Sequence, residues 1–181
     1  TLITSSAASD VYKRQTLAGT GINGYSGDGG IATEAQFNPE HELFRVAVDP
    51  KGDVYIADVE NHRIRKVTIS DGTISTVAGN GSAGFSGDGG NATDASLNRP
   101  SNIAFDSSGD MYILDSGNNR VRKVVLATGI ITTEAGPTGL SDARGIAVAP
   151  DGTVYLINTH GGGQLKKIEP GAVDNLVEVV G

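Results

Sequence analysis

Apolar residues in this chain come in short runs separated by turn-forming residues. The turns between them, such as 106–110, 115–119 and 127–129, are rich in Gly, Ser, Asp and Asn, which favour tight turns. Runs of this length joined by tight turns predict antiparallel strands connected by hairpins. In the middle of the chain the predicted strands are 103–105, 111–114, 120–125 and 130–135.

This pattern repeats along the chain. The segment from Gly24 to Gly30 returns sixty positions later as Gly84 to Gly90, with Phe85 in place of Tyr25. The strand at 53–58 returns at 110–115 and, in a divergent form, at 153–158. We place the repeat units at about 17–76, 77–133 and 134–181. Self-similarity at a fixed period is typical of repeat architectures.

The repeat unit predicts an all-β fold, a β-propeller built of four-stranded antiparallel blades. One four-stranded sheet is too small to be stable alone, so its two faces must pack against neighbours. Ile64 and Val67 fit this, because they point to opposite faces of one strand and both are apolar. We expect about three blades in an open arc, with 103–105 innermost and 130–135 outermost. A solenoid or a sandwich fits the pattern less well.

The motif around each second turn resembles the NHL repeat, named for its Asn-His-Leu turn. The first copy reads Asn61-His62-Arg63-Ile64 and the second Asn118-Asn119-Arg120-Val121, while 161–165 loses both Asn and Arg. The Gly-Asp-Gly-Gly segments resemble those of bacterial NHL proteins and teneurin-like proteins. The resemblance implies a propeller of about six blades, of which three repeats are present. An extracellular or cell-envelope location is expected from this resemblance and from no other feature of the sequence.

The two ends of the chain do not fit complete repeat units. Residues 1–15 resemble adapter-derived sequence or a disordered tail, so the predicted partial propeller covers 16–181. The last residues, 178–181, resemble 75–79, where a new unit begins. We therefore expect an internal piece of a longer protein, whose end blades expose apolar flanks. Self-association through these open blade edges is expected.

Two kinds of loop are predicted to share one face, here called the insert face. They are the long connections between blades, called the first insert (19–39) and the second insert (79–100), and the turns at 58–62 and 115–119. Long loops grouped on a rigid scaffold are common binding sites. A polar ligand or a cation would be bound there by Asp28, Asp58, Asn61, His62, Asp88, Asp115, Asn118 and Arg120. In the alternative interpretation, favoured for Asp58 and Asp115, these side chains bond their own turns.

The Gly27-Asp28-Gly29-Gly30 segment resembles a phosphate or calcium loop only superficially. A phosphate loop needs a following helix and usually Lys, and a calcium loop needs several oxygen ligands at alternating positions. A compact cap over the blade junction is the favoured interpretation. With no Cys and one carboxylate in each such segment, we expect no tight metal site, no cofactor and no catalytic residue.

The net charge and the composition limit the classes of partner that the chain is expected to bind. A net charge of −7 and only 5% aromatic residues argue against nucleic acid. The basic band at Arg63, Arg65 and Lys66, with its copy at Arg120, Arg122 and Lys123, is expected to be a solvated flank with salt bridges to neighbouring blades. An RNA-binding stripe is the alternative. No apolar run is long enough to span a membrane.

We therefore expect a non-catalytic binding scaffold whose partner is a protein or a glycan. Two alternatives remain open. The first is a channel-metal hydrolase or lyase, similar to propeller lactonases, with inward carboxylates from several blades. The second is an architectural module of a large secreted protein.

Overall fold

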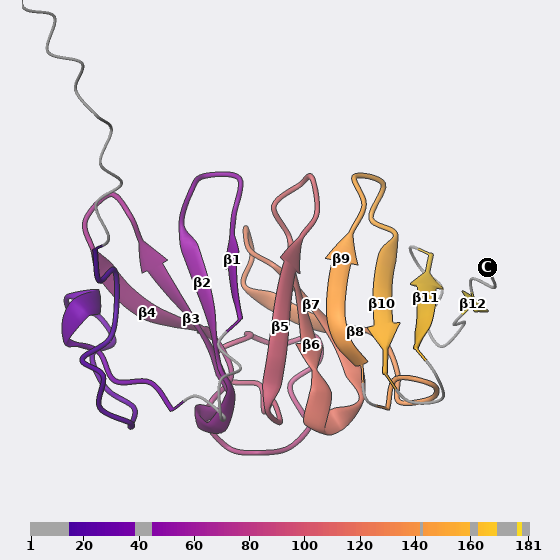
Figure 1. The fold of residues 1–181 in the computed structure, drawn as a ribbon, viewed down its shortest axis with the longest axis horizontal. Helices are drawn as coiled ribbons and strands as arrows, with labels where there is room; N and C mark the ends of the chain where they lie inside the picture. The colour runs from indigo at the N-terminus through magenta and orange to yellow at the C-terminus, as the bar shows by residue number, and fades with distance from the viewer. Residues whose placement is uncertain (1–14, 39–44, 142, 160–162, 170–176, 179–181) are drawn as a thin grey trace, which may run out of the picture.

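In the computed structural model, three four-stranded antiparallel sheets follow one another along the chain (Figure 1). The structure describes residues 15–38, 45–141, 143–159, 163–169 and 177–178, so all of the predicted tail except its last residue lies outside the described residues. The strands are β1 (Val46–Val48), β2 (Val54–Asp58), β3 (Arg63–Thr68), β4 (Thr73–Ala78), β5 (Pro100–Phe105), β6 (Met111–Asp115), β7 (Arg120–Val125), β8 (Ile130–Ala135), β9 (Ala143–Val148), β10 (Val154–Asn158), β11 (Gln164–Ile168) and β12 (Val177–Glu178). Three short 3-10 helices are η1 (Ala32–Glu34), η2 (Val59–Asn61) and η3 (Ser116–Asn118).

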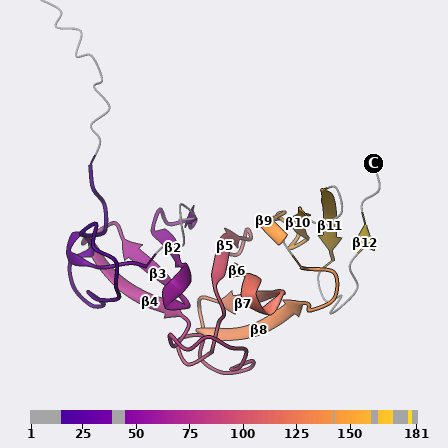
Figure 2. The same ribbon diagram turned by 60° about the horizontal axis from the view of Figure 1, so that its bottom comes forward.

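Each sheet is a meander whose strands pair in chain order, as predicted. The first strands form an inner row, because β5 packs against β1 on one side and β9 on the other. Figure 2 shows the sheets side by side along an open arc. The predicted all-β, blade-like fold is therefore confirmed, including the order of the strands in the second blade. Within the described residues, no helix is long and apolar enough to cross a membrane.

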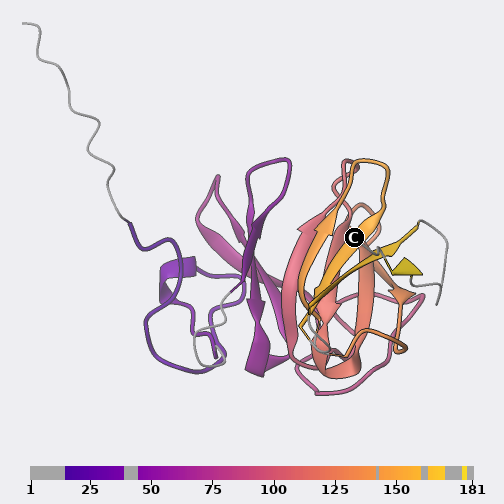
Figure 3. The same cartoon turned by 45° about the vertical axis from the view of Figure 1, so that its right-hand side comes forward.

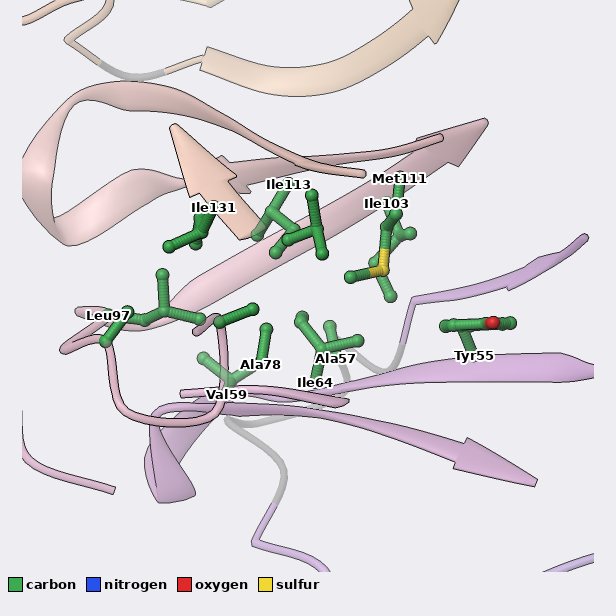
Figure 4. Close-up of a cluster of buried hydrophobic side chains, with 13 residues drawn as sticks. Tyr55, Ala57, Val59, Ile64, Ala78, Leu97, Ile103, Met111, Ile113 and Ile131 are labelled. Carbon is green, nitrogen blue, oxygen red and sulfur yellow. The ribbon is translucent and has the colours of Figure 1, made fainter. Parts of the chain in front are cut away.

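The core lies between the sheets rather than inside any one of them. Side chains of the first two sheets, among them Ile64, Ile103 and Met111, form one buried cluster (Figure 4). On the other face of β3, Val67 packs with residues of the first insert, including Ala35. Both Ile64 and Val67 are fully buried, so the two-sided burial expected from their opposite parity is confirmed.

The hairpin between the first two strands of a blade is organised by an aspartate. Asp106 Oδ1 accepts hydrogen bonds from the backbone N–H groups of Ser108 (3.0 Å) and Asp110 (2.9 Å). Asp49 does the same in the first blade, with Lys51 and Asp53. The turn passes through the left-handed region at Gly109, where φ is 83°. A β-branched side chain is strained at this φ.

The two ends of the arc expose apolar side chains. Val46 and Val48 are 61% and 59% exposed, whereas Ile103, at the position equivalent to Val46 in the second blade, is 5% exposed because the first blade covers it. At the other end, Ile157 and Leu165 are also exposed. The first insert, however, packs on Ile56, Val67 and Ile74 of the first sheet's outer flank, on the side away from the second sheet (Figure 3). The expectation that the apolar flank of the first blade lies exposed is therefore wrong for the part that the insert covers.

We predict that Gly109→Val lowers the free energy of unfolding by about 1–3 kcal/mol, because Val cannot adopt φ of 83° without strain. Urea denaturation measures the change. Ser108→Val is the matched control, since Ser108 is the exposed neighbour in the same turn. Equal midpoints for the two variants would contradict the prediction.

We also predict that the chain self-associates through its exposed flanks. Light scattering over a range of concentrations should give an apparent mass that rises with concentration. Ile157→Ser should reduce this rise, because it removes an exposed side chain of the last flank. Ile69→Ser, which removes a similarly exposed side chain in the turn between β3 and β4, should not. A monodisperse monomer at every concentration would show that the flanks do not associate.

Candidate binding face formed by the inserts

Each insert folds back on the blade that follows it and pairs with that blade's outer strand. In the first insert, Gly29 N–H donates to Ile74 O (2.8 Å) and Ile74 N–H donates to Gly30 O (3.0 Å). The second insert forms the same pair of bonds with Ile131 of β8. An outer strand without such pairing would present free backbone groups, which promote aggregation. The Gly-Gly segment thus protects a sheet edge.

The close approach of the chain to itself explains the first glycine of the Gly-Asp-Gly-Gly segment. A Cβ on Gly27 would lie 2.8 Å from the Cα of Ala35, and one on Gly87 would lie 2.6 Å from the Cα of Ala95. Both glycines also have φ near 90°. The favoured interpretation of a compact insert therefore agrees with the geometry, although the insert covers an outer edge and flank as well as the blade junction.

A fully buried arginine lies beneath each insert. Arg65 Nη2 is 2.7 Å from Asp28 Oδ1 of the first insert, and Arg65 Nη1 is 3.5 Å from Asp58 Oδ2 at the end of β2. The same side chain donates to the backbone oxygen of Ser26 (3.0 Å). Asp28 Oδ2 also accepts hydrogen bonds from Thr76 Oγ1 (2.6 Å) and the Tyr25 hydroxyl (2.7 Å). The arginine therefore joins insert, turn and strand.

The second blade repeats this arrangement. Arg122 Nη2 lies 2.7 Å from Asp88 Oδ1, and Arg122 Nη1 lies 3.7 Å from Asp115 Oδ2. Thr133 Oγ1 donates to Asp88 Oδ2 (2.7 Å). Phe85 replaces Tyr25, so the tyrosine hydroxyl bond has no counterpart here.

The buried aspartates also hold the turns of the insert face. Asp115 Oδ1 accepts from the backbone N–H of Asn98 (2.7 Å), and Asp115 Oδ2 accepts from Asn118 Nδ2 (2.7 Å). Asn118 Nδ2 also donates to Gly84 O (2.7 Å) in the second insert. Asp58 and Asn61 make the corresponding bonds in the first blade. The predicted meeting of turns and inserts on one face is therefore observed, and these polar groups bond one another.

The environment of these carboxyl groups differs. Burial raises the pKa of Asp115 to about 6, although its bonds from Asn118 and Asn98 and the charge of Arg122 oppose the shift. Burial likewise raises the pKa of Asp58. At Asp28, burial opposes ionisation, but the hydrogen bonds from Thr76 and Tyr25 and the charge of Arg65 prevail and lower the pKa.

His62 is positioned by the backbone of its turn. It ends η2 in the left-handed conformation, with φ of 54°, and Asn119 occupies the same position after η3 with φ of 52°. His62 Nδ1 accepts a hydrogen bond from the backbone N–H of Arg99 (3.1 Å). Arg99 Nη2 in turn lies 3.1 Å from Glu60 Oε1. His62 therefore connects the first blade to the strand entry of the second.

Exposed aromatic rings on the inserts carry stacked arginines, a feature that the sequence analysis did not single out. The Arg63 guanidinium lies 3.8 Å from the centroid of the Tyr25 ring, and that of Arg120 lies 3.9 Å from the Phe85 ring. Tyr25 and Phe85 remain 40% and 43% exposed. The sequence feature that could have indicated a role for these rings is their recurrence at the same position in two glycine-rich inserts.

The prediction that the basic band is a solvated flank with salt bridges to neighbouring blades is wrong for its two central residues, Arg65 and Arg122. Arg65 and Arg122 are fully buried rather than solvated, and their ion pairs lie within their own repeat units. Lys66 likewise pairs with Asp53 of its own blade at 2.6 Å. The band offers no continuous basic surface for RNA, because its central arginines are inaccessible.

The eight predicted ligand-binding residues therefore fall into three groups. Asp58 and Asp115 have no exposed surface, and Asp28, Asn61, Asp88, Asn118 and His62 all bond other parts of the chain. Arg120 is half-buried, and its one side-chain contact among the described residues is with the Phe85 ring. Within the described residues, no three His, Asp or Glu side chains are grouped so as to hold a metal ion. Ligand binding by these residues stays a prediction.

We predict that Arg122→Met lowers the free energy of unfolding by about 3–5 kcal/mol, because Asp88 and Asp115 lose their buried counter-charge. Lys123→Met is the matched control on the next position of β7. Its ammonium is partly exposed and pairs with Asp110 at 3.2 Å, so its loss should cost less than about 1 kcal/mol. Chemical denaturation measures both, and equal losses would contradict the central role of Arg122.

We also predict that Asp115 titrates near pH 6 in the folded protein, against an ordinary pKa of 3.8. Between these values the folded state keeps a proton that the unfolded state releases. Stability from this group is therefore greatest below about pH 4 and falls as pH rises through 6, by up to about 3 kcal/mol. Carboxyl-carbon NMR titration measures the pKa directly. A midpoint at or below 3.8 would contradict it.

Comparison with known proteins agrees with this architecture. The NHL repeat family model matches residues 45–67 and 97–124. Human teneurin-4 is 43% identical over 90 residues, which cover 42% of this chain and 3% of teneurin-4. Among solved structures, a chain of a nidogen/laminin complex has a TM-score of 0.58 at 20% identity, covering 76% of this chain and 47% of that one.

A second solved structure, virginiamycin B lyase from Staphylococcus aureus, has a TM-score of 0.54 at 20% identity, covering 78% of this chain and 43% of the lyase. At this identity the likeness concerns the fold alone. The chain spans only a small part of the curated relative and less than half of each solved chain. The matched repeats coincide with the strands and turns described above, so the chain carries NHL repeats folded as blades of a β-propeller, and teneurins are among its relatives.

Proposed function

We propose that this chain is a non-catalytic binding scaffold and that its insert face contacts a protein partner. The observation that carries the proposal is the pair of exposed, arginine-stacked rings, Tyr25 and Phe85. Exposed aromatic and arginine side chains are the residues most often found at the energetic centre of protein interfaces.

The frame beneath these rings supports the same function. Each insert is fixed by edge pairing with an outer strand and by an ion pair with a buried arginine. Phe85 therefore projects from a segment whose backbone is already held in place. A preorganised loop loses little conformational entropy on binding, which favours affinity.

The acidic residues of the insert face support this proposal less well. The carboxylates of Asp58 and Asp115 are buried, and that of Asp88 is engaged by Arg122 and Thr133. A ligand bound by these groups would have to displace internal bonds. The rings need no such rearrangement, so they are the better candidates for first contact.

The partner is tested by quantitative capture with immobilised protein from extracts, comparing wild type with Phe85→Ser. The matched control is Ile69→Ser, which removes a similarly exposed apolar side chain from a turn on the opposite face. A protein that the wild type and Ile69→Ser retain equally, and that Phe85→Ser loses by about tenfold or more, would support the proposal. Thermal melting checks that both variants fold.

Two outcomes would overturn the proposal. The first is the absence of any protein with this pattern of retention. The second is specific retention of a glycan on an array, again dependent on Phe85, with no protein ligand. Stoichiometric calcium or zinc that survives dialysis, measured by elemental analysis, would instead favour the alternative of a channel-metal hydrolase or lyase.

A further inference from the structure

The two arginine–aromatic pairs are equivalent in the repeat, but their surroundings differ. Arg63 Nη2 donates to Asn80 O of the second insert (2.8 Å), and Arg63 Nη1 donates to Asn61 O (3.0 Å). In the described part of the chain, Arg120 has one partner, the Phe85 ring. One site is therefore filled by the next insert, and the other is open.

The connection that follows each blade explains the difference. Between β4 and β5 the chain runs through residues 79–99 and brings Asn80 and Gly81 to Arg63. Between β8 and β9 it has only residues 136–142. The first residue of that connection, Gly136, still approaches Arg120, as Gly79 approaches Arg63. The described residues that follow it, 137–141, place no backbone carbonyl against the Arg120 guanidinium, so among the described residues its donors have no acceptor.

The contacts at Arg63 show which chemical groups an arginine–aromatic pair of this kind can bind. A Cβ on Gly81 would lie 2.2 Å from Arg63 Nη1 and 2.3 Å from Nη2. Gly81 also has φ of 90°. If this guanidinium moved away from an added methyl group, it would lose its stacking on the Tyr25 ring and its hydrogen bonds to two carbonyl oxygens. The site thus accepts a backbone carbonyl followed by a glycine in the left-handed conformation.

We propose that Arg120 and Phe85 form a binding site for an Asn-Gly turn of a protein partner, in which the turn's backbone carbonyl accepts from the guanidinium and its glycine lies over the guanidinium plane. The proposal narrows the proposed function to one contact and rests on it for the partner being a protein. The nearly equal stacking distances, 3.8 Å at Arg63 and 3.9 Å at Arg120, support the equivalence of the two sites.

The test uses the full chain with ¹⁵N-labelled arginine and a cyclised hairpin peptide whose turn is Asn-Gly. We expect the peptide to shift the Arg120 Nε–H resonance in a saturable manner and to leave that of Arg63 unchanged, because Arg63 is already occupied. A peptide with Asn-Ala in the turn should bind about tenfold more weakly or worse, since its methyl group meets the guanidinium. Arg120→Lys keeps the charge but loses the planar fork, and it should abolish peptide binding as measured by calorimetric titration.

Three results would overturn the proposal. They are no shift at Arg120 in a protein that NMR shows to be folded, equal responses to the Gly and Ala peptides, and a shift with acetate but none with the peptide. The readout does not depend on the natural partner. Failure of the capture experiment with Phe85→Ser would therefore leave the peptide result interpretable, and the reverse also holds.

Discussion

The buried guanidinium groups of Arg65 and Arg122 are the contacts on which blade, turn and insert depend together. A charge in an apolar interior is costly unless it is paired and hydrogen-bonded. Here each arginine meets one carboxylate from an insert and one from the end of a strand. If either segment moved away, the buried arginine would lose one of its two carboxylates. This explains how an insert with little regular secondary structure is held against a sheet.

The third repeat shows that these features belong together. Lys166 occupies the position of Arg65, and Asn158 that of Asp58, as the strand registers establish. The connection before this blade is short, and its described residues, 136–141, include no counterpart of Asp28. Lys166 instead donates to Gly139 O (2.9 Å) of that connection. In this blade, which has no long insert, a neutral amide replaces the carboxylate at the end of the second strand and a lysine replaces the arginine.

Local features of this fold could be predicted from the sequence, whereas the arginine contacts could not. Strand 130–135 and the turn at Gly109 follow from short apolar runs and glycine, which act over a few residues. The burial of both Ile64 and Val67 follows from their parity. Arg65, however, pairs with Asp28, which lies 37 positions earlier in the sequence. Its basic neighbours Arg63 and Lys66 are typical of a solvent-exposed strand, so the sequence gives no local sign that Arg65 is buried. The sequence feature that could have indicated the pair is that the second repeat keeps both an aspartate and an arginine at these positions, whereas the third repeat has Lys166 at the arginine position.

The same network decides which side chains on the insert face are available to a partner. Groups that satisfy one another's charge and hydrogen bonds have little to gain from a ligand, since a new contact would replace an existing one. Tyr25 belongs partly to this internal set, because its hydroxyl donates to Asp28. Phe85 has no hydroxyl, and in the described part of the chain no carbonyl accepts from Arg120 as Asn80 O accepts from Arg63. Two blades of one architecture thus differ at equivalent positions, because the long connection after the first blade brings Asn80 to Arg63 and the connection after the second blade is short.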